Sequence, residues 1–366
     1  MLSRQEIRIS KHEIRNKFKC SENQSTKTRR RRSPAVFDIG AFGFRSLFRI
    51  SCPPRRFFDF GFRASFLIAA SLPFVICGSL AGQQDFSRVE IKSTHVAGNV
   101  YMLEGSGGNI GVSVGSDGIL IVDDQFAPLA EKIRAALKKL GEGKLKFVLN
   151  THWHGDHTGG NPEFGREAAI IAHANVRKRL STTQHTLGRS HDPLPKHGLP
   201  VVTFDESLTV HFNDEEIRMV HYPHGHTDGD SVIIFAKSNV VHMGDLFFAG
   251  KFPFIDLNSG GDVEGVIRNV EAILAHIPKD ARIIPGHGPV SDIDGLKEYL
   301  GMLHETTAII RKGIAAGKTV DQLKKDGLPE KWKSWGDWFI STDKWIEIVH
   351  QSLTRGASDK DHEHKR

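Results

Sequence analysis

The dominant feature of this chain is the run THWHGDHTGG at residues 151–160, which places three imidazoles and a carboxylate within six positions. The four side chains are those of His152, His154, Asp156 and His157. Neutral imidazoles and a carboxylate that are buried together without a cation each lose hydration that nothing replaces. The run therefore predicts a metal site, and a histidine-rich surface loop is the alternative.

Three further segments with metal-binding side chains follow downstream. GHTDGD contains His226, MGDLF contains Asp245, and PGHGP contains His287. With the first run they supply five imidazoles and two carboxylates, which is enough for two metal ions if Asp245 bridges them. Nitrogen and oxygen donors without thiolate suit zinc, and they also suit iron or manganese. These segments favour the metal site over the surface loop.

With these motifs the chain resembles the metallo-β-lactamase superfamily, whose signature is His-x-His-x-Asp-His followed by one His, one Asp and one His. All seven positions are matched, and the resemblance covers roughly residues 95–300. It implies an α/β fold of the four-layer αββα sandwich type. It also implies that Asp245 bridges two metals, the first held by His152, His154 and His226, and the second by Asp156, His157 and His287.

The resemblance further implies a hydrolase that uses two zinc ions. Water shared by two metals about 3.5–4 Å apart has a pKa lowered towards about 7, which supplies a hydroxide nucleophile without Ser or Cys. The first metal would polarise the substrate carbonyl, the second would stabilise the leaving group, and Asp156 would orient the hydroxide. The predicted catalytic residues are Asp156, His154 and His226, and the predicted pocket-lining residues are Trp153, His224 and Phe248.

The substrate class stays open at this point. True zinc β-lactamases carry Cys or Ser where this chain has Asp245, and some carry a Lys where it has Phe248. The bridging Asp is similar to that of glyoxalase II, lactonases and other hydrolases, so we expect a small-molecule carbonyl substrate: a lactam, lactone, ester or thioester. The alternatives are a glyoxalase II-like thioesterase, a persulfide dioxygenase-like oxidoreductase with a single iron, and a non-enzymatic metal-binding role.

The basic charge of the chain is confined to its leader. The formal net charge is +6, but residues 1–63 hold 16 Lys and Arg against 5 Asp and Glu. Subtraction from 49 basic and 43 acidic residues leaves 33 and 38 from residue 64 onward, a balance of −5. No nucleic-acid partner is therefore predicted. Residues 1–63 are predicted to be a disordered basic leader, and the true translation start stays open.

A short apolar stretch, ASFLIAASLPFVIC, follows at residues 64–77. Arginines precede it, and Ser79 and Ala81 place small residues at −3 and −1 of a cleavage site after Ala81. The pattern predicts a signal at 64–81 and an exported, periplasmic or secreted product. No stable membrane anchor is expected, because the run is too short to span a bilayer comfortably. A buried core helix is the alternative, and the Sec and twin-arginine routes both stay open.

The cysteines also bear on the exported product. They occur at positions 20, 52 and 77 only, all before the predicted cleavage site. The mature chain would therefore contain neither a thiol nor a disulfide.

The body of the chain is predicted to fold as one domain at residues 86–300. Short β-branched runs separated by Gly and Asp from Val96 onward predict an antiparallel meander. PLAEKIRAALKKL at 128–140 predicts an amphipathic helix that ends at Gly141. Strands that lead into the metal motifs are predicted at 146–150, 218–223 and 231–245. Because ligands at the ends of such strands can meet at one edge of a sandwich, we expect the site there.

Two segments allow more than one interpretation. Residues 181–200 lack periodicity and contain three His, which indicates a mobile flap near the site or a surface loop. Residues 301–355 are predicted to be a helical, Trp-rich extension, with four of the five Trp between 332 and 345. Such aromatics cap a core more often than they bind a ligand, and a lid or a dimer face is the alternative. Residues 356–366 are predicted to be a charged tail, and the oligomeric state stays open.

Overall fold

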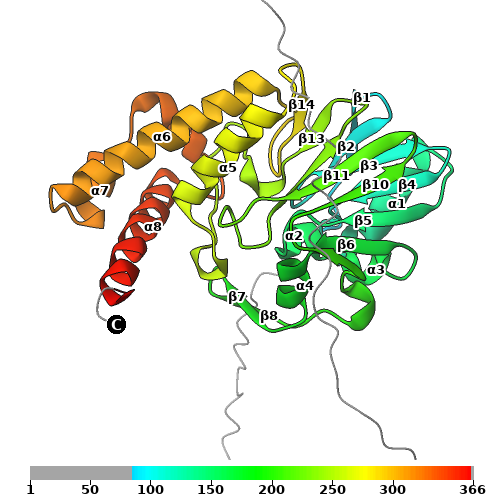
Figure 1. Ribbon diagram of the computed structural model, residues 1–366, viewed down its shortest axis with the longest axis horizontal. Helices are drawn as coiled ribbons and strands as arrows, with labels where there is room; N and C mark the ends of the chain where they lie inside the picture. The colour runs from blue at the N-terminus through cyan, green and yellow to red at the C-terminus, as the bar shows by residue number, and fades with distance from the viewer. Residues whose placement is uncertain (1–84, 364–366) are drawn as a thin grey trace, which may run out of the picture. The chain divides into compact units, whose positions relative to one another are not determined.

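Two β-sheets pack face to face in the computed structural model, which describes residues 85–363 and side chains as far as residue 355 (Figure 1). The predicted leader and signal, 1–63 and 64–81, lie outside the described residues. The first sheet has the order β1 (Lys92–Ala97), β2 (Val100–Glu104), β3 (Ile110–Gly115), β4 (Gly118–Val122), β5 (Leu145–Leu149), β6 (Ala169–His173) and β9 (Val202–Phe204). Strands β1 to β4 are antiparallel, as the predicted meander requires, and β5, β6 and β9 continue the sheet in parallel.

The second sheet has the order β10 (Ser207–Phe212), β11 (Glu215–His221), β12 (Ser231–Phe235), β13 (Val240–His242) and β14 (Arg282–Ile284). Side chains along its strands alternate between the two faces of the sheet: in β11, Ile217 and Met219 are buried while Arg218 is exposed. Successive side chains of a strand point to opposite faces, so this alternation turns one face of β11 to the interior. The buried residues pack against Leu120 and Leu149 of the first sheet and form the core between the sheets.

Helices cover the outer faces of both sheets and complete the predicted four-layer αββα sandwich. Helix α1 (Ala130–Leu140) buries Ile133 and Leu137 against the first sheet. It begins two residues after the predicted start, because Pro128 lies in a preceding 3-10 turn, η1 (Ala127–Leu129). Gly141 caps its end, as predicted. Helices α5 (Val263–His276) and α6 (Ile293–Ala315) pack beside each other on the second sheet, with Asp262 and Asp292 as N-caps.

The helical extension continues the core of the second sheet. It comprises part of α6, then α7 (Val320–Asp326), the 3-10 segment η5 (Glu330–Gly336) and α8 (Thr342–Glu363). Trp332, Trp335 and Trp345 are buried in the same cluster as the residues of α5, which confirms the core interpretation for these three. The boundary predicted at 300/301 falls inside the continuous helix α6, and α8 runs into the segment predicted as a tail.

Short elements complete the described chain. They are α2 (Gly155–Thr158), α3 (Asn161–Phe164), α4 (Ala174–Leu180), β7 (Gln184–Thr186), β8 (Arg189–His191), η2 (Lys196–Gly198), η3 (Gly244–Leu246) and η4 (Leu257–Ser259). Strands β7 and β8 form a small antiparallel hairpin inside the segment 181–200. None of the helices in the described region has the length and apolar character needed to cross a bilayer.

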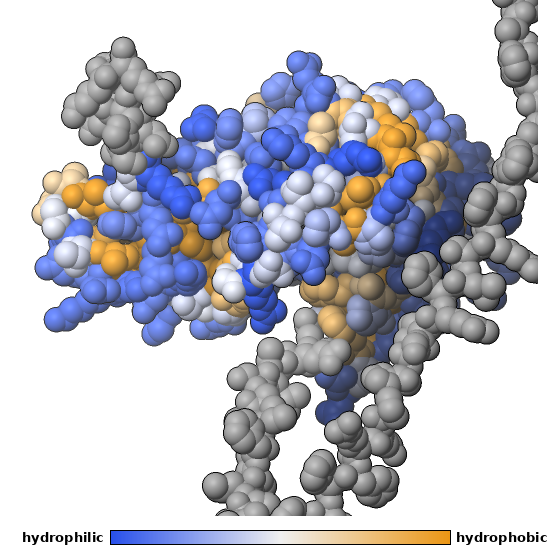
Figure 2. Space-filling view, turned by 90° about the horizontal axis from the view of Figure 1, so that it is seen from below, coloured by the Kyte–Doolittle hydropathy of each residue, from blue (hydrophilic) through white to orange (hydrophobic). Residues whose placement is uncertain are grey.

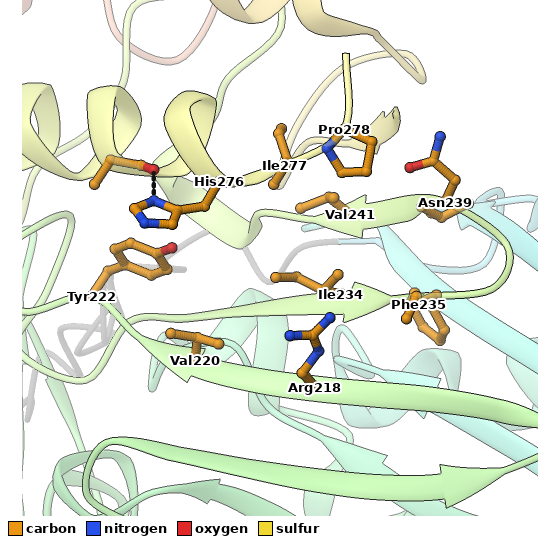
Figure 3. A pocket seen from close by; sticks show the side chains of 13 residues that line it. Arg218, Val220, Tyr222, Ile234, Phe235, Asn239, Val241, His276, Ile277 and Pro278 are labelled. Carbon is orange, nitrogen blue, oxygen red and sulfur yellow. Dashed lines mark hydrogen bonds between the residues drawn. The ribbon is translucent and has the colours of Figure 1, made fainter. Parts of the chain in front are cut away.

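The outer face of the second sheet is only partly covered. A cleft of about 530 Å³ lies between the end of α5 and strands β11 and β12, lined by Arg218, Tyr222, Ile234, His276 and others (Figure 3). Seen from below, hydrophobic residues gather both over the helical extension and over the sandwich, with hydrophilic residues between them (Figure 2). None of the residues of the histidine motifs lines this outer cleft.

Trp345 gives a test of whether the extension is part of the core. The side chain is fully buried, stacks on Phe252 with ring centroids 5.8 Å apart, and donates its indole N–H to Thr306 Oγ1 at 3.0 Å. We expect Trp345→Ala to lower the free energy of unfolding by about 3–5 kcal/mol, as measured by urea denaturation. The exposed Val201 serves as control, because Val201→Ala should stay within about 0.5 kcal/mol. Equal effects of the two substitutions would contradict a shared core.

Candidate metal centre

Seven side chains converge at one edge of the sandwich because each follows the end of a strand. The first histidines follow β5, His226 follows β11, Asp245 lies on η3 after β13, and His287 follows β14. The ligand atoms form two sets, each within 4.8 Å of one another: His152, His154, His226 and Asp245, and then Asp156, His157 and His287. The structure thus brings together all seven residues that the sequence singles out.

The carboxylate of Asp245 lies between the two sets. Its Oδ2 is 3.4 Å from His226 Nε2 and 3.8 Å from His152 Nε2, both of the first set. Its Oδ1 is 3.0 Å from His157 Nε2 and 3.5 Å from His287 Nε2, both of the second set. Each oxygen therefore faces a different group of imidazoles.

The first set is oriented by acceptors on its outer side. His154 Nδ1 and His226 Nε2 lie 2.8 Å apart and face each other. The opposite nitrogens donate outward, from His154 Nε2 to Asp256 Oδ2 at 3.1 Å and from His226 Nδ1 to the Phe254 carbonyl at 2.7 Å. A hydrogen bond at one ring nitrogen leaves the other with its lone pair directed at a metal.

The second set depends on Asp123, which the sequence analysis missed. His157 Nδ1 donates to Asp123 Oδ2 at 2.7 Å, and both the backbone N–H and the hydroxyl of Thr151 donate to the same carboxylate. Asp123 directly follows the buried strand β4 at the edge where the ligands gather, and that position was the available signal. Asp256 carried no comparable signal, since it reaches His154 across 102 residues of sequence.

Burial and the opposing charges set the pKa values of these groups. Burial lowers the pKa of His226 to about 4, so this imidazole is neutral at pH 7. Burial also works against a charge on His287, but the carboxylates of Asp245 and Asp156 outweigh it and raise its pKa to about 9. Burial likewise opposes the charge on Asp245, yet the imidazoles of His157 and His287 hold its pKa well below the usual range.

The residues fit metal ions, as three orphaned atoms indicate. His152 Nε2, His157 Nε2 and Asp245 Oδ1 are buried and form no well-aligned hydrogen bond, although the last two lie 3.0 Å apart. A buried polar atom left unpaired costs about 1–3 kcal/mol, and a cation between these donors would satisfy them together. Two glycines leave room for the ligand side chains: a Cβ at Gly108 would lie 2.1 Å from the His157 ring, and one at Gly286 would lie 2.0 Å from Asp245 Oδ1. Larger residues there would displace the ligands.

A cleft of about 680 Å³ opens over the two sets. Ligand residues form its floor, and its walls come from the β7–β8 hairpin, from Phe248 and Phe254, and from Trp338 and Phe339 of the extension. The segment 181–200 therefore contributes to the mouth of the site, which is the place expected of a flap.

Of the predicted lining residues, only Phe248 lines the cleft. Trp153 is buried in a separate cluster with Val176 and Leu180 of α4. Its neighbours in sequence, His152 and His154, both turn towards the metal sets, so Trp153 turns away from them. His224 is exposed, has a backbone φ of +53°, and lies outside the lining. The predictions for Trp153 and His224 are therefore corrected.

Comparisons with known proteins agree with this geometry. The family model "Metallo-beta-lactamase superfamily" matches residues 94–287, just over half of the chain. A hydroxyacylglutathione hydrolase of Rhodospirillum rubrum is 30% identical over 43% of the chain, and a metallo-beta-lactamase type 2 of Bacteroides fragilis is 24% identical over 45%. The chain spans 54% and 63% of the lengths of these two relatives.

Solved structures show a similar fold. A metallo-beta-lactamase from Pontibacter korlensis superimposes with a TM-score of 0.50 at 17% identity, covering 59% of this chain and 99% of the other. The likeness leaves about two fifths of this chain outside.

Asp256 provides the first test of the centre. Burial opposes its charge, but the His154 N–H lowers its pKa to about 2, so the carboxylate is ionised at pH 7. Asp256→Asn keeps an acceptor for the N-cap of η4 and removes the charge that polarises His154. We expect zinc affinity to fall by about 10–100-fold in a chelator competition assay. Asp262→Asn, a matched N-cap without a histidine partner, should leave zinc affinity unchanged, and equal losses would contradict this role.

The raised pKa of His287 predicts how metal binding depends on pH. In the metal-free protein His287 is protonated below about pH 9, so a metal at the second set must displace that proton. We expect apparent affinity to rise with pH up to about 9 and to level off above that value. Calorimetry in two buffers of different ionisation enthalpy should detect proton release at pH 7. Binding without proton release, at an affinity independent of pH, would contradict the assignment.

Proposed function

Because the chain belongs to the metallo-β-lactamase superfamily, we propose that it is a dinuclear, zinc-dependent hydrolase of small carbonyl compounds that acts after export. The position of Asp245 is the main support: its two oxygens face two different sets of imidazoles, as a bridging ligand requires. A structural metal site is closed, whereas this centre lies under an open cleft of about 680 Å³. The export proposal depends on the pattern at residues 64–81 alone.

The residues of the centre have separable roles in this proposal. Metal ions in the two sets would supply a Lewis acid for the carbonyl and a water of lowered pKa. Asp156 is the most exposed carboxylate of the centre, with 30% of its side chain accessible, and it faces the cleft. Burial opposes its charge, but His157 and His287 keep its pKa below the usual range, so it acts as a hydrogen-bond acceptor that orients the attacking water.

The substrate class follows from the ligand set and the cleft wall. Asp245 occupies the bridging position, and Phe248 presents an apolar ring beside His287, with centroids 5.1 Å apart. Because Phe248 is apolar where some zinc β-lactamases carry a Lys, lactones, esters and thioesters are favoured over β-lactams, and a substrate carboxylate would have to pair with another cation of the cleft. A thioesterase is the second candidate, supported by the likeness to hydroxyacylglutathione hydrolases.

A substrate panel with matched variants tests the proposal. Zinc-loaded protein should hydrolyse at least one of a lactone, an ester, a thioester and a chromogenic cephalosporin with kcat/KM above about 10⁴ M⁻¹s⁻¹. Asp156→Asn should lower kcat by about 10²–10⁴-fold, while the exposed Asp294→Asn should not. Chelation should abolish activity, and zinc should restore it.

Two results would refute the hydrolase. One is activity that survives complete removal of metal. The other is stoichiometric iron together with thiol-dependent oxygen uptake and no hydrolysis, which would favour the persulfide dioxygenase-like alternative.

A further inference from the structure

The helical extension reaches the metal centre through Trp338. The indole ring lies 5.7 Å from the ring of His287 and 5.5 Å from that of Phe248, measured between centroids. This contact joins a predicted metal ligand to a residue 51 positions beyond the end of the family match at 287. The cleft of this chain is therefore completed by a segment that the family model does not include.

Trp338 is held in a fixed orientation rather than left as a loose surface ring. Its Nε1–H donates to the Phe252 carbonyl at 3.0 Å, and the Lys251 ammonium lies 4.9 Å from the ring centroid. The Phe252 N–H in turn donates to the Trp335 carbonyl at 3.1 Å. Because Phe252 and Trp335 belong to the buried core, these hydrogen bonds tie the indole ring of Trp338 to that core.

Apolar side chains at the mouth of the cleft are unusually exposed. Phe339 is 63% accessible, and Leu187, at the tip of the β7–β8 hairpin, is 50% accessible. Within the described region, four large hydrophobic residues have such exposure, and these two line the cleft. Exposed apolar side chains at the rim of a concave site mark a surface that a ligand covers.

A cation lies in the same wall. Arg189 of β8 lines the cleft, and no carboxylate among the described residues forms an ion pair with it within 4 Å. The carboxylates in the lining are Asp156 and Asp245, which belong to the metal sets. Arg189 is therefore available for an anionic group of a ligand.

From these observations we propose a substrate class for the cleft, and this step rests on the proposed hydrolase function. The substrate is an anionic amphiphile. Its apolar chain or ring lies against Trp338, Phe339 and Leu187, and its carboxylate pairs with Arg189. The cleft volume of about 680 Å³ suits a molecule of drug size, and a small acyl group alone would not fill it.

Calorimetry with straight-chain alkanoates of four to ten carbons tests the apolar wall without requiring turnover. With zinc-loaded full-length protein, each added methylene should tighten binding by about two- to fourfold. In Trp338→Ala and in Phe339→Ser this dependence on chain length should fall below about 1.5-fold per methylene. Phe339 makes no contact with a metal ligand, so its variant keeps the test valid if Trp338→Ala loses zinc. Val201→Ser, at a comparable exposure of 67% outside the cleft, is the control.

Arg189 is tested with the same ligands. Arg189→Gln should weaken octanoate binding by about two- to fivefold, as expected for an exposed charge pair, and should leave octyltrimethylammonium binding no weaker. The exposed Arg166→Gln is the matched control and should have no effect.

The outcomes separate this inference from the proposed function. Alkanoate affinity that does not depend on chain length in the wild type would overturn the proposed apolar wall. A dependence on chain length that persists in both Trp338→Ala and Phe339→Ser would also overturn it. Equal effects of Arg189→Gln and Arg166→Gln would overturn the anion site. Hydrolysis of a panel substrate, together with alkanoate binding that does not depend on chain length, would support the hydrolase and refute an anionic amphiphile as its substrate. Chain-length-dependent binding without hydrolysis of any substrate would support the apolar site and refute the hydrolase.

Discussion

The carboxylate of Asp123 is the contact on which the metal centre depends. It is fully buried and accepts hydrogen bonds from the backbone and hydroxyl of Thr151 and from His157, so it ties the ends of β4 and β5 to α2. Its backbone φ of +63° is costly for a residue with a side chain, and these bonds offset that cost. Burial, followed by the charge of Asp123, raises the pKa of the adjacent Asp124 well above the usual range, so a second charge is disfavoured there.

The sequence predicted what is local or carried by a motif. Periodicity identified helix α1, the alternation of β11 and the meander, and the histidine motifs identified the seven residues that converge. Residues that act across long separations were not predictable in this way. Asp256 reaches His154, and Trp338 reaches His287, only because separate elements pack together. Trp153 is predicted to line the pocket, but its side chain packs against α4, on the side away from its neighbours His152 and His154.

The four tryptophans of the extension show how one residue type takes two roles. Trp332 and Trp335 lie on the 3-10 segment η5, where side chains three residues apart share a face, and both are buried. The segment ends at Gly336, so Trp338 leaves that face and lies at the cleft instead. The abundance of tryptophan alone indicates a core, and the end of η5 at Gly336 determines that Trp338 lies outside it.

The ligand set described above contains nitrogen and oxygen atoms only, and no cysteine occurs from residue 78 onward. No protein ligand of the centre can therefore be converted to a sulfenic acid or captured in a disulfide. Oxidants and reductants that act on cysteine therefore have no target among the residues of this centre.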